Sequence, residues 1–362
     1  MGRRVRRSDS PAATVAGGLL GVPGLALPTP VQRADRLAAA LGVARELWVK
    51  RDDRTAPAYG GNKPRKLARL LDDAVARDRR TIITFGGLGT NHGLATTVHA
   101  AARGIRTVLV LVPQPVTARV VTNLRLDHAL GAELHVADGV VAAARRAVAV
   151  AARCWRRGER PLVVPPGGSS ALGTMGYVDA GLELVAQVRA GEMPAPGAVF
   201  VAVGSGGTAA GLALGLRAGG LATVVVGVVV TDLLPPTTAR LLRLAHAAGR
   251  RAGGVASTTR LDAGALRLVD GFIGRGYGHP TPEAERAVAC AADAEHLPLE
   301  TTYTGKCLAA LAAMARANDV PPGPLLFWNT VSSVEPLPPD GRLPPVAALP
   351  AAIRARLGDV AP

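Results

Sequence analysis

The sequence predicts an α/β protein built on parallel sheets. Short, apolar, β-branched runs recur along the chain, and Ala/Leu/Arg segments with helical periodicity lie between them. Strands that are apolar on both faces are typical of parallel sheets covered by helices. The 362 residues, of which 48% are hydrophobic and only 3% aromatic, predict two domains or one large one, with a core of Ala, Val and Leu.

The apolar runs give seven predicted strands. In chain order these are Leu47–Arg51, Thr81–Phe85, Thr107–Val112, Pro161–Val164, Ala198–Val203, Thr223–Val230 and Leu325–Trp328. The helical patterns between them include Arg65–Arg77, Thr117–Leu130, Val140–Arg156, Leu172–Arg189 and Pro282–Ala294. The proline-rich segment from Glu335 is expected to wrap the surface or to lie loosely on it.

Composition argues against a membrane or nucleic-acid protein. No apolar run reaches the ~18 residues of a membrane span. The net charge of +15 invites a nucleic-acid interpretation, but the arginines are scattered and few aromatic residues accompany them as stacking platforms. Three widely spaced cysteines without a CxxC pair predict neither a disulfide framework nor a metal site. We therefore expect a solvated, Arg-biased surface with no nucleic-acid and no membrane partner.

The N-terminus carries the one dense basic cluster, Arg3, Arg4, Arg6 and Arg7. The apolar stretch that follows gives it a faint likeness to a twin-arginine export signal. Gly21-Val22-Pro23-Gly24 interrupts that stretch. We interpret residues 1–26 as an Arg-rich flexible tail ahead of a cytoplasmic protein.

Lysine is rare in this chain. Of 42 basic residues only four are lysines, and three of them fall between positions 50 and 66; the four are Lys50, Lys63, Lys66 and Lys306. A lysine amine can be deprotonated by burial and then act as a nucleophile, whereas a guanidinium stays protonated. A lysine in an arginine-rich chain therefore suggests amine chemistry, with chance as the alternative.

The first motif joins Lys50-Arg51-Asp52-Asp53 to Gly60-Gly61-Asn62-Lys63-Pro64-Arg65-Lys66-Leu67. A strand ends in charged residues, a glycine turn follows, and a proline stands where a helix begins. Lys63 is thus predicted at the carboxyl end of a strand, where ligands gather in open α/β sheets. The helix N-terminus, Arg65 and Lys66 are expected to lower its pKa. The alternative is a solvated turn lysine.

A second glycine turn, Gly86-Gly87-Leu88-Gly89-Thr90-Asn91-His92-Gly93, leads from a predicted strand into a helix. Hydroxyl, amide and imidazole groups stand at the helix start. Backbone N–H groups there suit an anion such as a substrate carboxylate. The alternative is N-capping by Thr90 or Asn91.

A third turn, Val203-Gly204-Ser205-Gly206-Gly207-Thr208-Ala209-Ala210-Gly211, has the features of a phosphate cradle made of backbone N–H groups, hydroxyls and a helix dipole. It lacks the lysine of a Walker loop, and its spacing does not give GxGxxG with a following acidic residue. A monophosphate ester fits it better than a nucleotide does.

Polar groups also interrupt the apolar C-terminal half, at Tyr303-Thr304-Gly305-Lys306 and at Tyr277. Taken alone, these are ordinary half-buried tyrosines at loop edges. Together the four segments supply an amine, a phosphate cradle and a turn that suits a carboxylate. That set matches the requirements of pyridoxal phosphate.

The ordered motifs from about Leu27 to Trp328 resemble those of the aminocyclopropane-carboxylate deaminase and D-cysteine desulfhydrase family. That family belongs to the tryptophan-synthase-β-like, fold type II, pyridoxal phosphate enzymes. Further markers are Leu27-Pro28-Thr29-Pro30, Pro166-Gly167-Gly168-Ser169-Ser170 and Leu172-Gly173-Thr174-Met175-Gly176-Tyr177.

This resemblance implies a fold of two open parallel-sheet three-layer domains with the cofactor in the cleft between them. Residues 27–65 and 176–362 would form the large cofactor-binding domain, and residues 66–175 the small substrate-side domain. A small amino-acid substrate and a homodimer are expected with it.

The resemblance also assigns roles to the motif residues. Lys63 would form a Schiff base with pyridoxal phosphate and later remove the α-proton. Thr90, where the family usually has a serine, and the tyrosines Tyr277 and Tyr303 would be the other catalytic groups. Substrate contacts are expected from Thr90, Asn91 and His92. Cofactor contacts are expected from Asn62, Lys63, Asn91 (on the phenolic oxygen), Gly204, Ser205, Gly206, Gly207, Thr208 and Thr304. No metal is expected.

Position 304 discriminates within the family. The deaminases resemble Tyr-Glu-Gly-Lys there, and the glutamate holds the pyridine nitrogen protonated. Thr304 gives this chain the desulfhydrase-like form. A hydroxyl can donate to an unprotonated nitrogen, so the ring is a weaker electron sink, which suffices when the β-substituent is a good leaving group such as a thiolate. This favours β-elimination from a D-cysteine-like substrate to pyruvate, sulfide and ammonia.

Two departures from the family pattern leave the substrate open. Asn329-Thr330-Val331-Ser332 stands where the family has His-Thr-Gly-Gly, and Glu300-Thr301-Thr302 stands where Asp-Pro-Val is common. The alternatives that remain are ring opening of aminocyclopropane carboxylate, β-replacement, cofactor binding without turnover, and nucleic-acid binding through the arginine tail.

Overall fold

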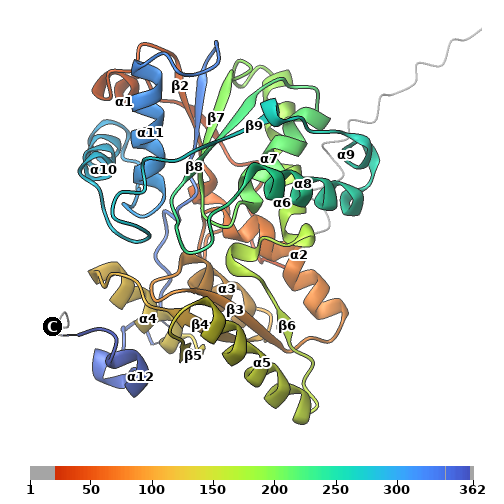
Figure 1. The fold of residues 1–362 in the computed structure, drawn as a ribbon, viewed down its shortest axis with the longest axis vertical. Coiled ribbons are helices and arrows are strands. Elements are labelled where there is room, and N and C mark those ends of the chain that lie inside the picture. Colours follow the sequence, from red (N-terminus) through yellow and green to blue (C-terminus); the bar gives the residue numbers. More distant parts are fainter. Residues whose placement is uncertain (1–20, 339, 359–362) are drawn as a thin grey trace, which may run out of the picture.

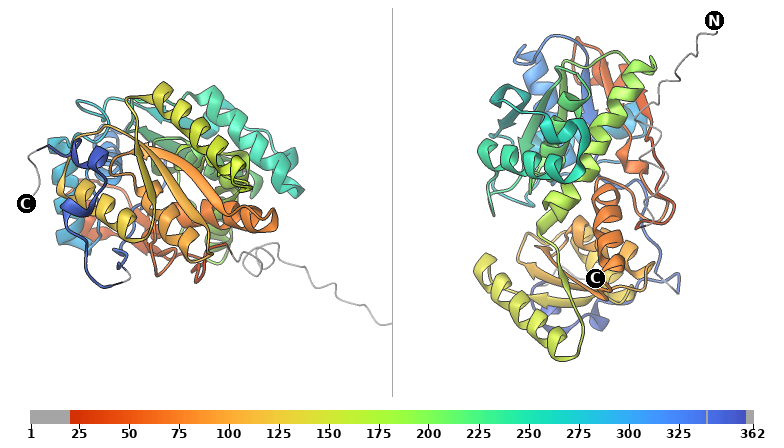
Figure 2. Two further views of the ribbon diagram at one scale, coloured as in Figure 1. Left: turned by 90° about the horizontal axis from the view of Figure 1, so that it is seen from below. Right: turned by 90° about the vertical axis from the view of Figure 1, so that its right-hand side faces the viewer.

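The computed structural model describes residues 21–338 and 340–358, so the predicted basic cluster at positions 3–7 lies outside the described residues. The chain forms two lobes stacked along the long axis of the molecule, each built around its own sheet (Figure 1 and Figure 2). The predicted class, α/β with parallel sheets, is confirmed.

The larger lobe contains a six-stranded sheet in the order β1-β2-β10-β7-β8-β9. All neighbouring strands run parallel except the edge pair β1 and β2. The strands are β1 (Val31–Arg33), β2 (Leu47–Lys50), β7 (Ala198–Val203), β8 (Val224–Val229), β9 (Leu266–Val269) and β10 (Leu325–Trp328). The two edge strands β1 and β9 were not predicted, because both are short and contain polar residues: β1 reads Val-Gln-Arg, and β9 has an arginine among its apolar residues.

Helices cover both faces of this sheet and make three layers. One face packs against α6 (Ala171–Arg189), α7 (Gly207–Ala218), α8 (Thr238–Ala252) and α9 (Gly254–Thr258). The other face packs against α1 (Asp35–Ala40), α10 (Pro282–Glu295) and α11 (Thr304–Arg316). Successive side chains of a strand point to opposite faces of the sheet. In β7, Val199 therefore packs in the core on the α6 and α7 side, and Phe200 packs in the core on the α10 and α11 side.

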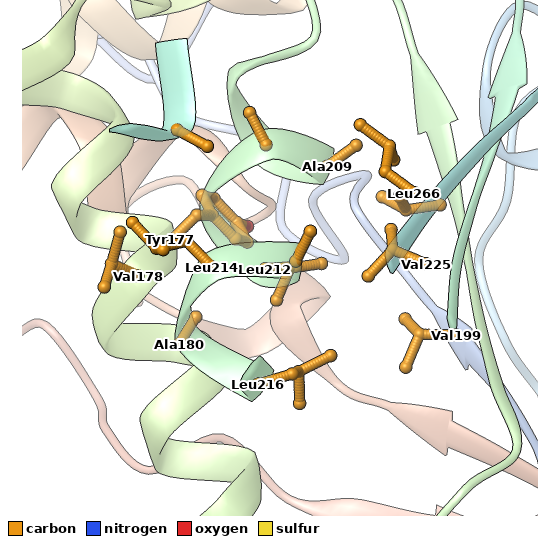
Figure 3. Close-up of a cluster of buried hydrophobic side chains, with 14 of the residues drawn as sticks. Tyr177, Val178, Ala180, Val199, Ala209, Leu212, Leu214, Leu216, Val225 and Leu266 are labelled. Carbon is orange, nitrogen blue, oxygen red and sulfur yellow. The ribbon is translucent and has the colours of Figure 1, made fainter. Parts of the chain in front are cut away.

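Figure 3 shows the first of these cores, where α6 and α7 lie against the sheet. Leu212 and Leu216 of α7 lie between the strand residues Val199 and Val225 and helix α6 (Figure 3). The two helices approach closely, because a Cβ built on Gly215 would stand 2.2 Å from the carbonyl oxygen of Val178. Helix α7, which begins at the predicted phosphate cradle, is therefore held rigidly on the sheet.

The smaller lobe contains a parallel four-stranded sheet in the order β5-β4-β3-β6. Its strands are β3 (Thr81–Gly87), β4 (Arg106–Val112), β5 (Glu133–Val136) and β6 (Leu162–Val163). Helices α2 (Lys63–Ala76), α3 (Asn91–Ala101) and α4 (Ala118–Ala129) cover one face, and α5 (Val140–Arg156) covers the other. Strand β5 was not predicted, since its four residues alternate polar and apolar.

Both chain ends depart from the expected organisation. Helix α12 (Ala351–Arg354) lies beside β5 and α4 in the smaller lobe, and Ile353 is buried against that sheet (Figure 1). The proposed boundaries had placed residues 346–357 in the large domain. At the other end Val22 is 1% exposed and packs with Leu67 of α2, so residues 21–26 are not part of a loose tail.

No helix in the described ranges is long and apolar enough to cross a membrane. Within the same residues no group of three or more His, Cys, Asp or Glu side chains is placed to hold a metal ion.

Candidate active site

A cavity of about 340 Å³ lies between the two lobes. Its wall is formed at the carboxyl ends of β3, β7 and β10 and at the loop that precedes α2. The predicted site residues in this wall are Asn62, Lys63, Thr90, Asn91, Gly204, Ser205, Gly206, Thr208, Tyr277 and Tyr303. Gly207, His92 and Thr304 were predicted as site residues but do not line it.

Lys63 is the first residue of α2, and its side chain lines the cavity. Its Nζ donates to Oδ1 of Asn62 at 2.5 Å. Loss of water around the amine lowers the pKa of Lys63 to about 8, and the carboxylate of Glu300 opposes that shift. Burial is thus the main cause, rather than the helix N-terminus and basic neighbours expected from the sequence. The result is an amine that can lose its proton near neutral pH.

A buried charge cluster holds the start of α2. Arg65 forms two hydrogen bonds to Asp52, at 3.0 and 2.8 Å, and two to Glu183 of α6, at 2.9 and 2.8 Å. Lys50 at the end of β2 also bonds Glu183, at 2.6 Å. Two cations and two carboxylates balance, which is the condition for burying such groups. Since Arg65 is two residues beyond Lys63, the cluster fixes the position of the lysine.

The same cluster accounts for two residues that drew attention in the sequence. Lys50 is fully buried in it and lies outside the cavity wall. The Tyr177 hydroxyl donates to Asp52 at 2.7 Å, and Tyr177 does not line the cavity either. The scarcity of lysines and tyrosines therefore marked structural residues as well as those of the site.

The segment Asn329–Ser332 clamps the loop that carries Lys63. The backbone N–H of Asn62 donates to the Thr330 carbonyl at 3.0 Å, and that of Gly60 donates to Ser332 Oγ at 2.8 Å. Gly61 has a φ of +85°, and a Cβ there would stand 2.7 Å from the Thr330 oxygen. The departure from the family sequence at these positions thus supplies a hydroxyl that holds the lysine loop.

The Gly204–Thr208 turn makes an anion cradle at the start of α7. The N-cap residue Gly206 has no side chain to cap this helix. Ser169 Oγ accepts the Gly207 N–H at 3.1 Å, and the N–H groups that follow in the first turn can serve a ligand. A Cβ on Gly207 would stand 2.5 Å from Ser169 Oγ, which only glycine allows. The hydroxyl of Thr174, close to Gly207, is buried without a hydrogen-bond partner among the described residues.

Lys66 adds an amine to this cradle. Its Nζ donates to Ser169 Oγ at 3.2 Å, and Ser169 Oγ lies 2.7 Å from Ser205 Oγ. Burial, together with the charge of Lys63, holds the pKa of Lys66 well below its ordinary value. An anion in the cradle would favour the charged form of this amine. Neither Lys66 nor Ser169 was among the predicted site residues.

Thr90 and Asn91 stand where β3 passes into α3. Thr90 Oγ1 accepts the Gly93 N–H at 3.3 Å, so it caps the helix as well as lining the cavity. The amide oxygen of Asn91 lies 3.3 Å from Asn123 Nδ2 and 3.5 Å from the Tyr59 hydroxyl. Because the Asn91 oxygen accepts from these two donors, the NH₂ group of Asn91 is the part that faces the cavity, where it can donate a hydrogen bond.

His92 lies behind the cavity wall. Its Nε2 is 2.9 Å from the Thr84 hydroxyl, and its Nδ1 has no hydrogen-bond partner within the described part of the chain. Burial and the nearby Lys63 and Lys66 hold the pKa of His92 well below its ordinary value, which favours the neutral ring. Direct substrate contact by His92 therefore stays a prediction without support from its position.

Tyr277 and Tyr303 lie in contact with each other in the cavity wall. Their hydroxyls share a hydrogen bond, and their rings pack edge to face with centroids 5.9 Å apart. Burial raises the pKa of Tyr277 to about 12 and that of Tyr303 well above its ordinary value. Both therefore keep their protons at neutral pH.

Thr304 is the first residue of α11, and its hydroxyl is hydrogen-bonded to Glu300. Thr304 Oγ1 accepts the Glu300 N–H at 2.9 Å and lies 3.2 Å from Glu300 Oε1. Glu300 itself lines the cavity. The sequence indicated Glu300 only as a departure from the family pattern, because its place in the cavity depends on how the loop folds back on α11.

A family of sequences described as pyridoxal-phosphate dependent enzymes matches residues 22–330. The chain belongs to this family. Its cofactor is accordingly pyridoxal phosphate, in agreement with the prediction. Two relatives, D-cysteine desulfhydrases of Salmonella typhi and of Salmonella paratyphi C, are each 38% identical over 311 residues, which cover 84% of this chain and 91% of the relative.

Two solved structures have a similar architecture. One described as an ACC deaminase homologue aligns with a TM-score of 0.75 and 30% identity over 86% of this chain and 91% of the other. Threonine deaminase isoform 2 from Solanum lycopersicum aligns with a TM-score of 0.57 and 17% identity over 88% and 83%, a likeness of fold alone. The predicted fold type II arrangement is confirmed.

Proposed function

We propose that this enzyme is a β-eliminating lyase that converts D-cysteine, or a closely similar small amino acid, to pyruvate, sulfide and ammonia. The observation that carries the proposal is Lys63, an amine with a pKa of about 8 in a cavity that also has an anion cradle. The 38% identity to D-cysteine desulfhydrases supports the choice of substrate.

The residues present fit pyridoxal phosphate. The N–H groups of α7 that follow Gly207, the amine of Lys66 and the unpartnered Thr174 hydroxyl suit a phosphate group. The NH₂ group of Asn91 suits the phenolic oxygen, and Lys63 suits the carbonyl carbon. When bound, pyridoxal phosphate supplies an electron-withdrawing system that stabilises negative charge at the substrate's α-carbon.

Lys63 is the acid–base group of this proposal. Lys63 would hold the carbonyl carbon of the cofactor, and its amine, when free, would accept the α-proton of the substrate. Its pKa near neutrality allows both steps. The start of α3, with Thr90 and neighbouring N–H groups, orients the substrate carboxylate.

The tyrosine pair serves the leaving group. Tyr277 and Tyr303 hold their protons at neutral pH, so one of them donates a hydrogen bond to the departing sulfur. Overall, D-cysteine and one water give pyruvate, hydrogen sulfide and ammonia. The Cα–H and Cβ–S bonds break, and water hydrolyses the released enamine.

A substrate panel tests this proposal. Purified enzyme with pyridoxal phosphate is incubated with D-cysteine, L-cysteine and aminocyclopropane carboxylate, with and without an added thiol nucleophile. We expect pyruvate and sulfide in equal amounts from D-cysteine. Ring-opened product from the cyclopropane, or a thioether with the added thiol, would instead assign the alternative deaminase or β-replacement reactions.

We predict that covalent attachment of pyridoxal phosphate to the apoenzyme accelerates with pH through a half-point near 8, because the neutral Lys63 amine is the nucleophile. A lysine with an ordinary pKa would place this half-point at about 10.4. Glu300, Lys66 and His92 are the titratable groups that face this amine. Glu300→Gln should lower the half-point, since the carboxylate raises the Lys63 pKa.

The rates are measured from the absorbance change after mixing. Nα-acetyl-lysine at the same pH values corrects for titration of the cofactor itself. A half-point above 10 would contradict a desolvated Lys63.

We further propose a homodimer in the cytoplasm without a nucleic-acid partner. Large exposed apolar side chains such as Val141, Val148 and Trp155 of α5 support self-association. Light scattering of the pure enzyme tests the dimer. A mobility shift of DNA at low salt that disappears as salt rises would contradict the absence of nucleic-acid binding.

A further inference from the structure

Glu300 is an acid among basic groups in the cavity wall. The other charged side chains of the described lining are Lys63, Lys66 and Arg240. Glu300 lies in the loop before α11 and is 8% exposed. The mechanism proposed above gives this buried carboxylate no task in the reaction.

The start of α11 holds the carboxylate of Glu300 in place. Its Oε1 accepts the N–H groups of Tyr303 and Thr304, each at 2.9 Å, and its Oε2 accepts the Thr302 N–H at 2.8 Å. Backbone donors at a helix N-terminus favour the negative charge. A carboxylate offers about four acceptor positions. Oε2 has one donor among the described residues, so it can accept another from the cavity.

The carboxylate faces the cavity without pairing with the lysine. Its charge raises the pKa of Lys63, Tyr59 and Tyr277, which places it near all three groups. The Lys63 amine nevertheless donates to Asn62. Glu300 therefore lines the same cavity as these groups, with a free acceptor position.

The chemistry of the cofactor identifies a donor for that position. In pyridoxal phosphate the ring nitrogen is para to the carbon that bears the carbonyl group. A lysine at the carbonyl and a partner of the ring nitrogen must consequently stand at opposite edges of the ring. The α7 cradle and Asn91 serve the phosphate and the phenolic oxygen, which leaves the nitrogen without a partner.

We propose that Glu300 is the partner of the cofactor's ring nitrogen, accepting its N–H bond and keeping the nitrogen protonated. The inference rests on the proposed function, because it requires pyridoxal phosphate held by Lys63. A carboxylate near pyridine nitrogen strengthens the electron-withdrawing character of the ring. Glu300 thus compensates for Thr304, whose hydroxyl implied a weaker electron sink.

The competing partner is the hydroxyl of Thr330, which also lines the cavity. Ser332 is a poorer candidate, since its hydroxyl already bonds Gly60 and Val334. A hydroxyl would donate to an unprotonated nitrogen, whereas a carboxylate requires a protonated one. The two partners therefore predict opposite protonation states.

The test uses pyridoxal phosphate labelled with ¹⁵N in the ring and bound to the full-length enzyme. Borohydride reduction of a separate sample and mass spectrometry first establish that the cofactor is on Lys63. We expect the wild-type ¹⁵N resonance at the position of a protonated pyridine. In Glu300→Gln it should move to that of an unprotonated one. The matched control Glu285→Gln, an exposed glutamate on α10, should resemble wild type.

Each outcome decides the question. An unprotonated nitrogen in the wild-type enzyme overturns the inference, and so does a Glu300→Gln resonance that stays in place. If Glu300→Gln does not fold, Thr330→Val separates the partners, since the nitrogen should stay protonated when Glu300 holds it. Absence of the reduced adduct on Lys63 removes the proposed function together with the inference. Its presence with an unprotonated nitrogen removes the inference alone.

Discussion

Replacing Asp52 with asparagine is expected to lower the free energy of unfolding by about 3–5 kcal/mol, the cost of breaking a buried charge pair from one side. Asp52 is fully buried and accepts hydrogen bonds from Arg65, Thr29, Tyr177 and Trp328. An asparagine NH₂ group would face donors where the carboxylate accepts, and it would leave the Arg65 guanidinium with Glu183 alone.

Urea unfolding followed by tryptophan fluorescence measures this effect, because Trp328 itself contacts Asp52. Asp319→Asn is the matched control, since Asp319 pairs with Arg267 at the surface with both side chains about half exposed. An exposed pair of this kind contributes little to stability. Equal losses in the two variants would show that the cluster around Asp52 does not anchor the fold.

Replacing Lys63 with alanine is expected to reduce the rate of elimination by at least about 10²–10⁴-fold, the share that one positioned acid–base group contributes. The variant loses the amine that holds the cofactor carbonyl as well as the base for the α-proton. Lys63→Arg should be equally inactive, since a guanidinium keeps the charge but cannot act as the nucleophile.

Lys66→Ala separates the two lysines. It should weaken binding of pyridoxal phosphate, because Lys66 lies beside the cradle, and yet leave the covalent link possible. Pyruvate formation and cofactor content are measured for all three variants. Residual activity of Lys63→Ala within tenfold of wild type would exclude Lys63 from the role proposed for it.

The sequence predicted the interior strands well and the edges poorly. β7 and β10 are continuous apolar runs, because helices cover both of their faces, and their predicted bounds are those of the structure. β1, β5 and β9 are short, and polar residues interrupt their apolar pattern. An edge strand pairs with only one neighbouring strand, and short edge strands of this kind leave a weak pattern in the sequence.

The candidate site shows the same division. Lys63, Asn91 and the Gly204–Thr208 turn could be predicted because each lies where a local pattern of strand, turn and helix ends. Glu300 could not, since its place in the cavity depends on segments far apart in the chain. Lys66 was indicated only as a basic neighbour of Lys63, although it follows that residue by three positions on α2. Thr304 was predicted to face the cofactor, whereas its hydroxyl bonds Glu300, which lies four residues earlier in the loop before α11.

Locating the cofactor on the chain tests the central claim most directly. The enzyme purified with pyridoxal phosphate is reduced with borohydride and digested, and the modified peptide is identified by mass spectrometry. Lys50, Lys66 and Lys306 serve as internal controls, because they are the other lysines of the chain. We predict the reduced adduct on Lys63 alone. An adduct on another lysine, or none on an enzyme that still eliminates sulfide from D-cysteine, would contradict the account.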